Sequence, residues 1–237
     1  MHSPLAKQRQ QILDQQAKGE AVAVAPNTES LHLKLVEFEN DKKALKNINS
    51  IAEKAKHKRE VLIPKYQPSV EAYLEAGEVF ENPIFTLMII WLFDIGDMET
   101  AINWLTRAIE LNIPTPAGFK REDWQTICAD EVLTWSTEQS KKGQFVEPYF
   151  SQVKENIFGG WDINEAIKAQ YLKFEALELL MNDKREPQPT AIGDVDALKK
   201  SIELMEQAEA LHSKAGVGTM RKKAEQRVRA LETGKNL

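Results

Sequence analysis

The chain has 237 residues, of which 31 are Lys or Arg and 36 are Asp or Glu, so its formal net charge is −5. A single cysteine, Cys128, excludes an intrachain disulfide and a cysteine-rich zinc site, and it fits a reducing compartment. The longest apolar run, 84–93, is too short to span a bilayer, and no secretory leader opens the sequence. We therefore expect a soluble cytosolic protein without membrane contact.

Charge is distributed unevenly along the chain. Residues 42–59 hold seven basic residues and one acidic residue, and residues 214–235 hold seven and two. Between them, residues 66–213 hold 12 basic and 26 acidic residues. An electrostatic field depends on where the charges lie. Two basic segments that flank an acidic body therefore favour a polyanionic partner over ordinary solvated lysine faces.

The N-terminal residues 1–28 are rich in Gln and Ala and carry no helix signal, so we expect a flexible arm. From residue 29 onward, apolar residues recur at spacings of three, four and seven, which predicts a basic helical segment over 29–65. The stretch "NINS" (47–50) indicates a break between two helices. We expect Pro64 and Pro68 to end this segment, because proline cannot continue a helix and restricts the residue before it.

Asn82 and Pro83 predict the start of the next helix, since Asn is a strong N-cap and Pro fits the first helical position. The run "PIFTLMIIWLF" that follows is apolar on nearly all sides, which indicates a central helix. Gly96 can end this helix in the left-handed conformation, and Asp97 can cap the following one. That second helix is expected to end before Pro114.

Helical patterns continue to the end of the chain. Apolar residues recur at helical spacing over four further stretches, 124–135, 167–181, 194–211 and 218–231. Asp162 and Glu165 match a capping box, and residues 185–190 read as an exposed loop. No stretch shows sustained alternation of apolar and polar residues, so the sequence predicts an all-α fold. We divide it into the arm, the basic segment, an acidic helical body over 66–213 and a basic C-terminal helix over 214–237.

Asp94 and Asp97, on either side of Gly96, are the first candidates for a metal site. A calcium loop requires oxygen donors at alternating positions and a distal glutamate, which this stretch lacks. The four histidines lie far apart, and the sequence holds no phosphate-binding loop or nucleophile elbow. Cys128 lies on an apolar helical face, so we interpret it as a core residue. The sequence thus indicates a turn at Gly96, and no metal, cofactor or catalytic residue.

The stretch "GDMETAINWLTRAIELNIP" (96–114) resembles the second half of a tetratricopeptide repeat. Gly96 stands at the turn, Ala101 and Ala108 occupy the small positions where two helices pack closely, and Pro114 lies just past the end. Residues 193–211 repeat the pattern less well. The body is therefore expected to be an irregular array of tetratricopeptide-like helical hairpins.

Residues 61–116 carry a more specific resemblance. Leu62 and Pro64 open this block, "TLMIIWLFDIGD" forms its helix and corner, and Pro114 and Pro116 close it. The block resembles the signature region of the small terminase subunit of tailed temperate phages, a family also labelled the terminase endonuclease subunit. The likeness weakens in the middle of the chain and returns near 215–231.

The resemblance implies a phage- or prophage-encoded protein of the host bacterial cytoplasm that recognises concatemeric viral DNA at its cleavage site. It implies three partners: double-stranded viral DNA, a large subunit that holds the ATPase, and further copies of this chain, in a ring or another homo-oligomer. We find no nuclease constellation in the sequence. We therefore interpret the family label as the cleavage-directing role of the complex, and whether this chain is itself an enzyme stays open.

The basic residues define two candidate surfaces. Lysine suits phosphate contact better than bidentate base recognition, so the first surface is expected to supply affinity for DNA. Its residues are Lys42, Lys43, Lys46, Lys54, Lys56, Lys58 and Arg59. The second is expected to contact DNA or the large subunit, and its helix to be removable without loss of the fold. Its residues are Arg221, Lys222, Lys223, Arg227 and Arg229.

Two other functions stay open at this point. One is a tetratricopeptide-like adaptor that binds only proteins, and the other is a genuine endonuclease with an unrecognised acidic metal site. The apolar helix over 84–93 and the tryptophan-bearing helices also predict a homo-oligomer, since thin helical hairpins rarely bury so much apolar surface alone.

Overall fold

The computed structural model describes residues 28–77, 80–119 and 123–234, so the predicted N-terminal arm lies outside the described residues apart from Thr28. The chain divides into two compact units, residues 1–54 and 55–237. Over the described ranges every regular element is a helix, which confirms the all-α prediction, and an isolated bridge joins Met181 to Pro187. The tetratricopeptide-like arrangement remains a prediction. No helix in this part of the chain is both long and apolar enough to cross a bilayer.

In the first unit, α2 (Thr28–Lys46) is followed by α3 (Ile51–His57), which runs on into the second unit. Ser50 starts α3, because its hydroxyl oxygen accepts a hydrogen bond from the Glu53 backbone N–H over 3.3 Å. The break predicted over 47–50 is therefore confirmed, and its cause is local capping chemistry.

The second unit begins with the end of α3, a π-helical turn η1 (Lys58–Leu62) and α4 (Ile63–Ala76). The expectation that Pro64 and Pro68 end the helix is wrong, since α4 runs through both. Pro64 directly follows the π-helical turn η1, at the start of α4. Pro68 removes one hydrogen bond, at a cost of about 3 kcal/mol. Buried Val70 and Tyr73 offset this cost, at about 1.5–3 kcal/mol for each large apolar side chain.

The helices α5 (Pro83–Ile95) and α6 (Met98–Glu110) meet at the corner predicted from the sequence. Asn82 caps α5, since its side-chain oxygen accepts from the backbone N–H groups of Ile84 and Phe85. Gly96 ends α5 with a φ of +79°. The Asp97 carboxylate accepts from the Thr100 backbone N–H over 3.1 Å and caps α6. The corner is thus a helix-capping turn.

Most side chains of α5 are buried within the chain. Ile84, Phe85, Met88, Ile89 and Leu92 are each at most 1% exposed. The elements packed against α5 are α4, α6 and η1. The apolar surface of α5 is therefore covered intramolecularly, so this helix alone does not support a homo-oligomer, which stays a prediction.

Three helices follow, α7 (Trp124–Lys141), α8 (Tyr149–Gly159) and α9 (Glu165–Glu178). Sequence reasoning missed α8, although its buried Phe150, Val153 and Ile157 recur at helical spacing. The capping box predicted at Asp162 is also wrong. Asn164 caps α9 instead, since its side-chain oxygen accepts from the Ala166 backbone N–H over 2.8 Å.

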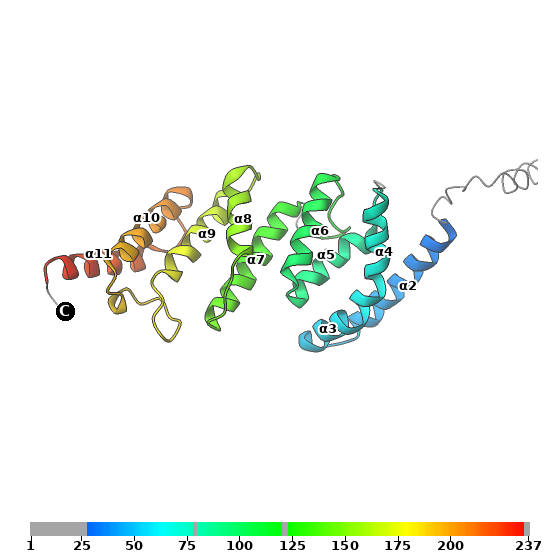
Figure 1. The fold of residues 1–237 in the computed structure, drawn as a ribbon, viewed down its shortest axis with the longest axis horizontal. Coiled ribbons are helices and arrows are strands. Elements are labelled where there is room, and N and C mark those ends of the chain that lie inside the picture. Colours follow the sequence, from blue (N-terminus) through cyan, green and yellow to red (C-terminus); the bar gives the residue numbers. More distant parts are fainter. Residues whose placement is uncertain (1–27, 78–79, 120–122, 235–237) are drawn as a thin grey trace, which may run out of the picture. The chain divides into compact units, whose positions relative to one another are not determined.

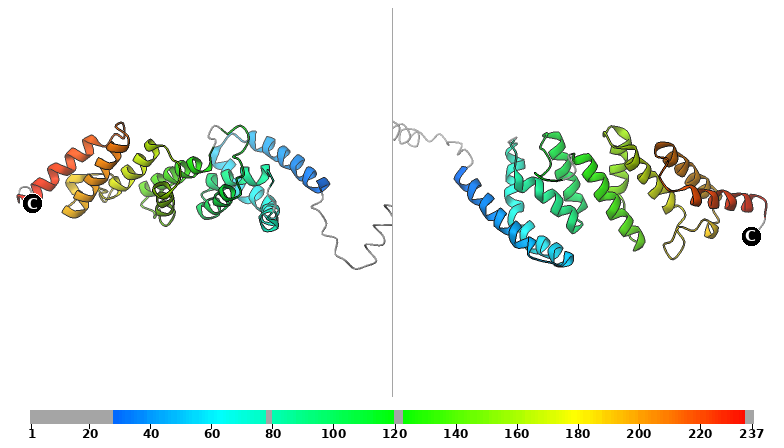
Figure 2. Two further views of the ribbon diagram at one scale, coloured as in Figure 1. Left: turned by 90° about the horizontal axis from the view of Figure 1, so that it is seen from above. Right: turned by 180° about the vertical axis from the view of Figure 1, so that it is seen from behind.

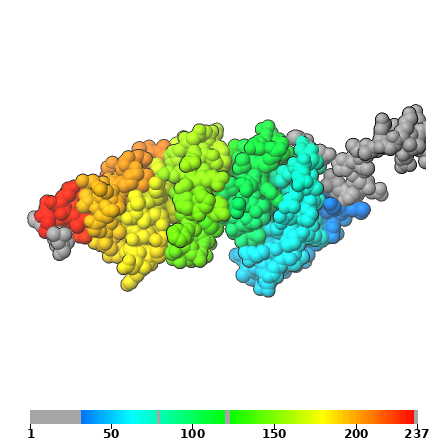
Figure 3. Space-filling view, viewed as in Figure 1, coloured from blue at the N-terminus to red at the C-terminus, as the bar shows by residue number. Residues whose placement is uncertain are grey.

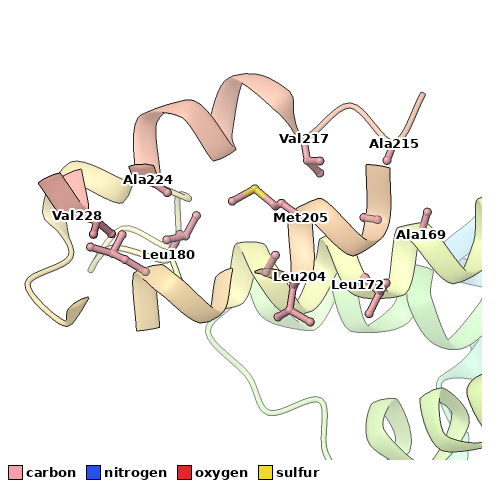
Figure 4. Packing of buried hydrophobic residues seen from close by; sticks show 12 residues of the cluster. Ala169, Leu172, Leu180, Leu204, Met205, Ala215, Val217, Ala224 and Val228 are labelled. Carbon is pink, nitrogen blue, oxygen red and sulfur yellow. The ribbon is translucent and has the colours of Figure 1, made fainter. Parts of the chain in front are cut away.

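The C-terminal part consists of η2 (Pro189–Ala191), α10 (Val195–Leu211) and α11 (Gly218–Glu232). Figure 4 shows the buried cluster to which Leu172, Leu180, Met205, Val217 and Val228 belong, with Leu180 near Val228. In both views of Figure 2, α11 lies beside α10. The C-terminal helix is therefore not separable from the body, because its removal would expose this core. The loop expected over 185–190 is likewise only partly exposed, since Pro189 is buried.

Replacing Gly96 by Ala should lower the free energy of unfolding by about 1–2 kcal/mol, the cost of a left-handed conformation for a residue with a Cβ. A Cβ at this position would meet only the Trp135 indole nitrogen, at an ordinary contact distance of 3.9 Å. Gly159, whose φ is not positive and whose Cβ would meet nothing within 4 Å, provides the matched control. Urea denaturation of both variants is the measurement, and equal losses would contradict the assignment of the corner.

Candidate nucleic-acid and partner surfaces

Lys43 and Lys46 lie in the last turn of α2, where cations are favoured by the helix dipole. Lys43 and Lys46 are exposed and have no ion pair within the described part of the chain. Lys42 differs, since its Nζ lies 2.7 Å from a Glu39 carboxylate oxygen and 5.8 Å from the centre of the Phe38 ring. The first unit therefore presents Lys43 and Lys46 as available charges.

Lys58 and Arg59 contact the end of α5. The Lys58 Nζ donates to Asp94 Oδ2 over 2.5 Å, and the Arg59 Nη2 donates to the Ile95 carbonyl oxygen over 2.7 Å. The Lys58 side chain is only 12% exposed, whereas that of Asp94 is 45% exposed. Both cations therefore stabilise the helix end, where unpaired carbonyl groups and the dipole attract positive charge.

The predicted DNA-binding segment thus contains cations in different situations. Lys56 is exposed, Lys54 is partly exposed, and neither forms an ion pair with another described residue. Lys58 and Arg59 already have partners within the second unit. Contact with DNA by these residues stays a prediction, and the unpaired lysines are its best-placed members.

On α11, Arg221 is the centre of an ion-pair cluster. Its guanidinium nitrogens lie 3.5 Å from Glu206, 3.1 Å from Glu209 and 2.9 Å from Glu225. Two of these carboxylates belong to α10, so Arg221 links α10 to α11. Arg221 therefore has a structural role in addition to the contact predicted for it.

The remaining cations of α11 are divided between the fold and the surface. The Arg227 Nε donates to the Ile192 carbonyl oxygen over 2.9 Å, at the end of η2. Lys222, Lys223 and Arg229 are exposed. Lys223 and Arg227 also line a cavity of about 610 Å³ with Gln226, Ala230 and residues 187–190. The exposed cations are the ones available to an external partner.

A further group of basic side chains was missed from the sequence. Lys141, Lys173 and Arg185 line a cavity of about 290 Å³ between α7, α9 and the loop that follows α9. These residues belong to the acidic body and are separated along the chain, so no local motif marks them.

Two titratable core residues, Cys128 and Tyr171, have pKa values raised by burial. Burial, with a smaller contribution from Glu131, raises the pKa of the Cys128 thiol far above its usual range. Burial likewise raises the pKa of Tyr171, whose hydroxyl donates to the Ala129 carbonyl oxygen over 2.8 Å. Cys128 is thus a buried, protonated core residue, as predicted. Over the described ranges, no group of three or more His, Cys, Asp or Glu residues could hold a metal ion.

Comparison with known proteins identifies the family. The model of the phage small terminase subunit matches residues 35–166, which include the block that carried the resemblance. The chain belongs to this family.

Two curated members of the family are similar to this chain. The "Probable terminase, endonuclease subunit" of Haemophilus phage HP1 is 34% identical over 213 residues, which are 88% of this chain and 74% of that protein. The "Terminase, endonuclease subunit" of Escherichia phage P2 is 26% identical over 145 residues, 61% of this chain and 58% of that protein. No solved structure matches the chain.

Within this small terminase, the structural role of Lys58 can be tested against its neighbour Lys56. The change Lys58→Gln should lower the free energy of unfolding by about 0.5–1 kcal/mol, because it removes a partly buried ion pair. The matched change Lys56→Gln should alter the free energy of unfolding by no more than about 0.5 kcal/mol, as is usual for surface substitutions.

A double-mutant cycle with Asp94→Asn isolates the pair. Its coupling free energy in denaturant titrations should reach about 0.5–1 kcal/mol. A coupling of zero would show that Lys58 and Asp94 do not stabilise the end of α5.

Proposed function

We propose that this small terminase recognises viral DNA and directs its cleavage and packaging, together with a large subunit that carries ATPase and nuclease activities. Family membership over residues 35–166 is the observation that carries the proposal. Lys43, Lys46 and Lys56 support it, since they are exposed and lack ion pairs within the described part of the chain. Such charges can replace the counterions of a DNA backbone. The site of action is the cytoplasm of the host bacterium.

The proposed assembly includes the large subunit and further copies of this chain. Both relatives are named as one subunit of a terminase, which supports a second subunit as a partner. A homo-oligomer, including a ring, would present several copies of the basic segment to one DNA molecule. Linked copies bind more tightly than one, because the second contact forms at a high effective concentration.

A nuclease activity of this chain is the second candidate function. It is favoured by the word "endonuclease" in the names of both relatives. Incubating the isolated chain with viral DNA and Mg²⁺ separates the two functions. Cleavage that an acidic-to-amide substitution abolishes would assign the reaction to this chain, whereas cleavage only with the large subunit would assign it to the partner.

Replacing Lys43, Lys46, Lys54 and Lys56 by Gln should weaken binding to specific and non-specific DNA alike. Each lysine that touches a phosphate contributes about 0.9 to the slope of log affinity against log salt, so this slope should flatten. Titration of packaging-site and unrelated duplexes at several salt concentrations is the measurement. Circular dichroism should show unchanged helix content, because these side chains lie outside the buried core.

The control variant carries the same change in charge elsewhere, with Gln at Lys142, Lys168, Lys184 and Lys200. Its salt slope should equal that of the wild type. If both variants lose the same affinity, only net charge matters and the basic segment is not the DNA surface. If the wild type binds no DNA, a protein-only adaptor replaces the proposed function.

A further inference from the structure

The cavity between α7 and α9 has an apolar floor. Leu133 lies on α7, Phe174 and Leu177 lie on α9, and Met181 and Pro187 belong to the following loop. Phe174 is buried, whereas the other four side chains are partly exposed and leave apolar surface open in the cavity. Figure 3 shows the C-terminal part of α7 and the loop after α9 side by side on the face in view.

The edge of this cavity is basic. Lys141, Lys173 and Arg185 line it, and Glu178 is the single acidic lining residue. Lys142 directly follows Lys141 in the chain, and Lys184 directly precedes Arg185. Residues 66–213 hold 26 acidic and only 12 basic residues, so the basic edge of the cavity is opposite in sign to the net charge of this part of the chain.

The loop that carries Arg185 is held in one conformation. Arg185 has a φ of +60°, which is uncommon for a residue with a side chain. Its Nε donates to the Ser140 carbonyl oxygen over 2.8 Å, and its Nη2 lies 2.9 Å from Glu178 Oε2. The Asn182 side-chain oxygen also accepts from the backbone N–H groups of Lys184 and Glu186, over 2.9 and 3.0 Å.

The lysines at the edge are anchored to different degrees. The Lys173 Nζ donates to the Ala215 carbonyl oxygen over 2.9 Å, so its position is set by the start of the final segment. Lys141 is exposed and has no ion pair among the described residues. The site therefore combines a preformed loop, which lowers the ordering cost of binding, with an exposed lysine that has no ion pair among the described residues.

We propose that the cavity between α7 and α9, called the groove from here on, binds a segment of the large terminase subunit. In this segment apolar side chains lie next to acidic ones. This proposal rests on the proposed function, which supplies the partner. The apolar side chains would cover Leu133, Leu177 and Met181, and a carboxylate would pair with Lys141. A protein segment fits better than duplex DNA, because the phosphate backbone offers charge but no apolar surface for the floor.

Two groove variants test the proposal by titration with the purified large subunit. Lys141→Glu reverses the charge at the edge, and Met181→Gln keeps the side-chain length while making the floor polar. Each should weaken the affinity for the large subunit about tenfold and leave DNA affinity unchanged. Lys168→Glu is the matched control, since this lysine lies on α9 outside the groove lining and should leave both affinities unchanged.

A cysteine variant locates the contact directly. Cys128, the single cysteine, is buried with a raised thiol pKa, so Met181→Cys introduces the one thiol expected to react with a maleimide in the folded chain. The large subunit should slow labelling at position 181 several-fold, and packaging-site DNA alone should not.

The outcomes separate failure of this inference from failure of the proposed function. If the wild type binds the large subunit and both groove variants bind equally well, the inference is wrong and the proposed function stands. If DNA affinity falls instead, the groove contacts nucleic acid, and a lower oligomer mass would assign it to a second copy of this chain; either result overturns the inference. If the wild type does not bind the large subunit, the partner is wrong and the inference fails with it.

Discussion

The apolar surface of α5 is the constraint on which the N-terminal part of the second unit depends. A helix that is apolar on nearly every side must be covered on every side. The chain meets this need by packing α4, α6 and η1 against it. The covering elements bring Lys58 and Arg59 to the end of α5, where one pairs with Asp94 and the other caps the Ile95 carbonyl group. Lys58 and Arg59, which the sequence predicts to contact DNA, therefore also stabilise the end of α5.

Several structural features set by neighbouring residues could be predicted, although α8 and the cap at Asn164 were missed, and features set by distant residues could not be predicted. The caps at Asn82 and Asp97 and the glycine at the corner follow from residues a few positions apart, so the sequence was sufficient. The pairing of Lys58 with Asp94 joins residues 36 positions apart, and that of Arg185 with Ser140 joins residues 45 apart. No local pattern reports such contacts. The error at Pro68 has the same origin, since burial of the helix decides the outcome there.

The candidate surfaces show the same division. Sequence reasoning located both basic segments, because clustering of charge is visible in the sequence itself. It could not distinguish a lysine without an ion pair in the fold from one that already forms an ion pair. It also missed the groove between α7 and α9, whose basic edge exists only because helix ends distant in the chain meet in the fold. The structure is therefore needed to separate basic residues that are paired within the fold from exposed ones that have no ion pair among the described residues.

Amine footprinting by mass spectrometry tests most directly which lysines are paired within the fold and which contact DNA. The chain would be treated with an acetylating reagent alone and with saturating packaging-site DNA, and modification would be followed at each lysine. The account predicts that DNA protects Lys43, Lys46, Lys54 and Lys56, that Lys58 reacts slowly in both samples because Asp94 holds it, and that Lys141 is unaffected. Equal modification of Lys43, Lys46, Lys54 and Lys56 with and without bound DNA would contradict the account.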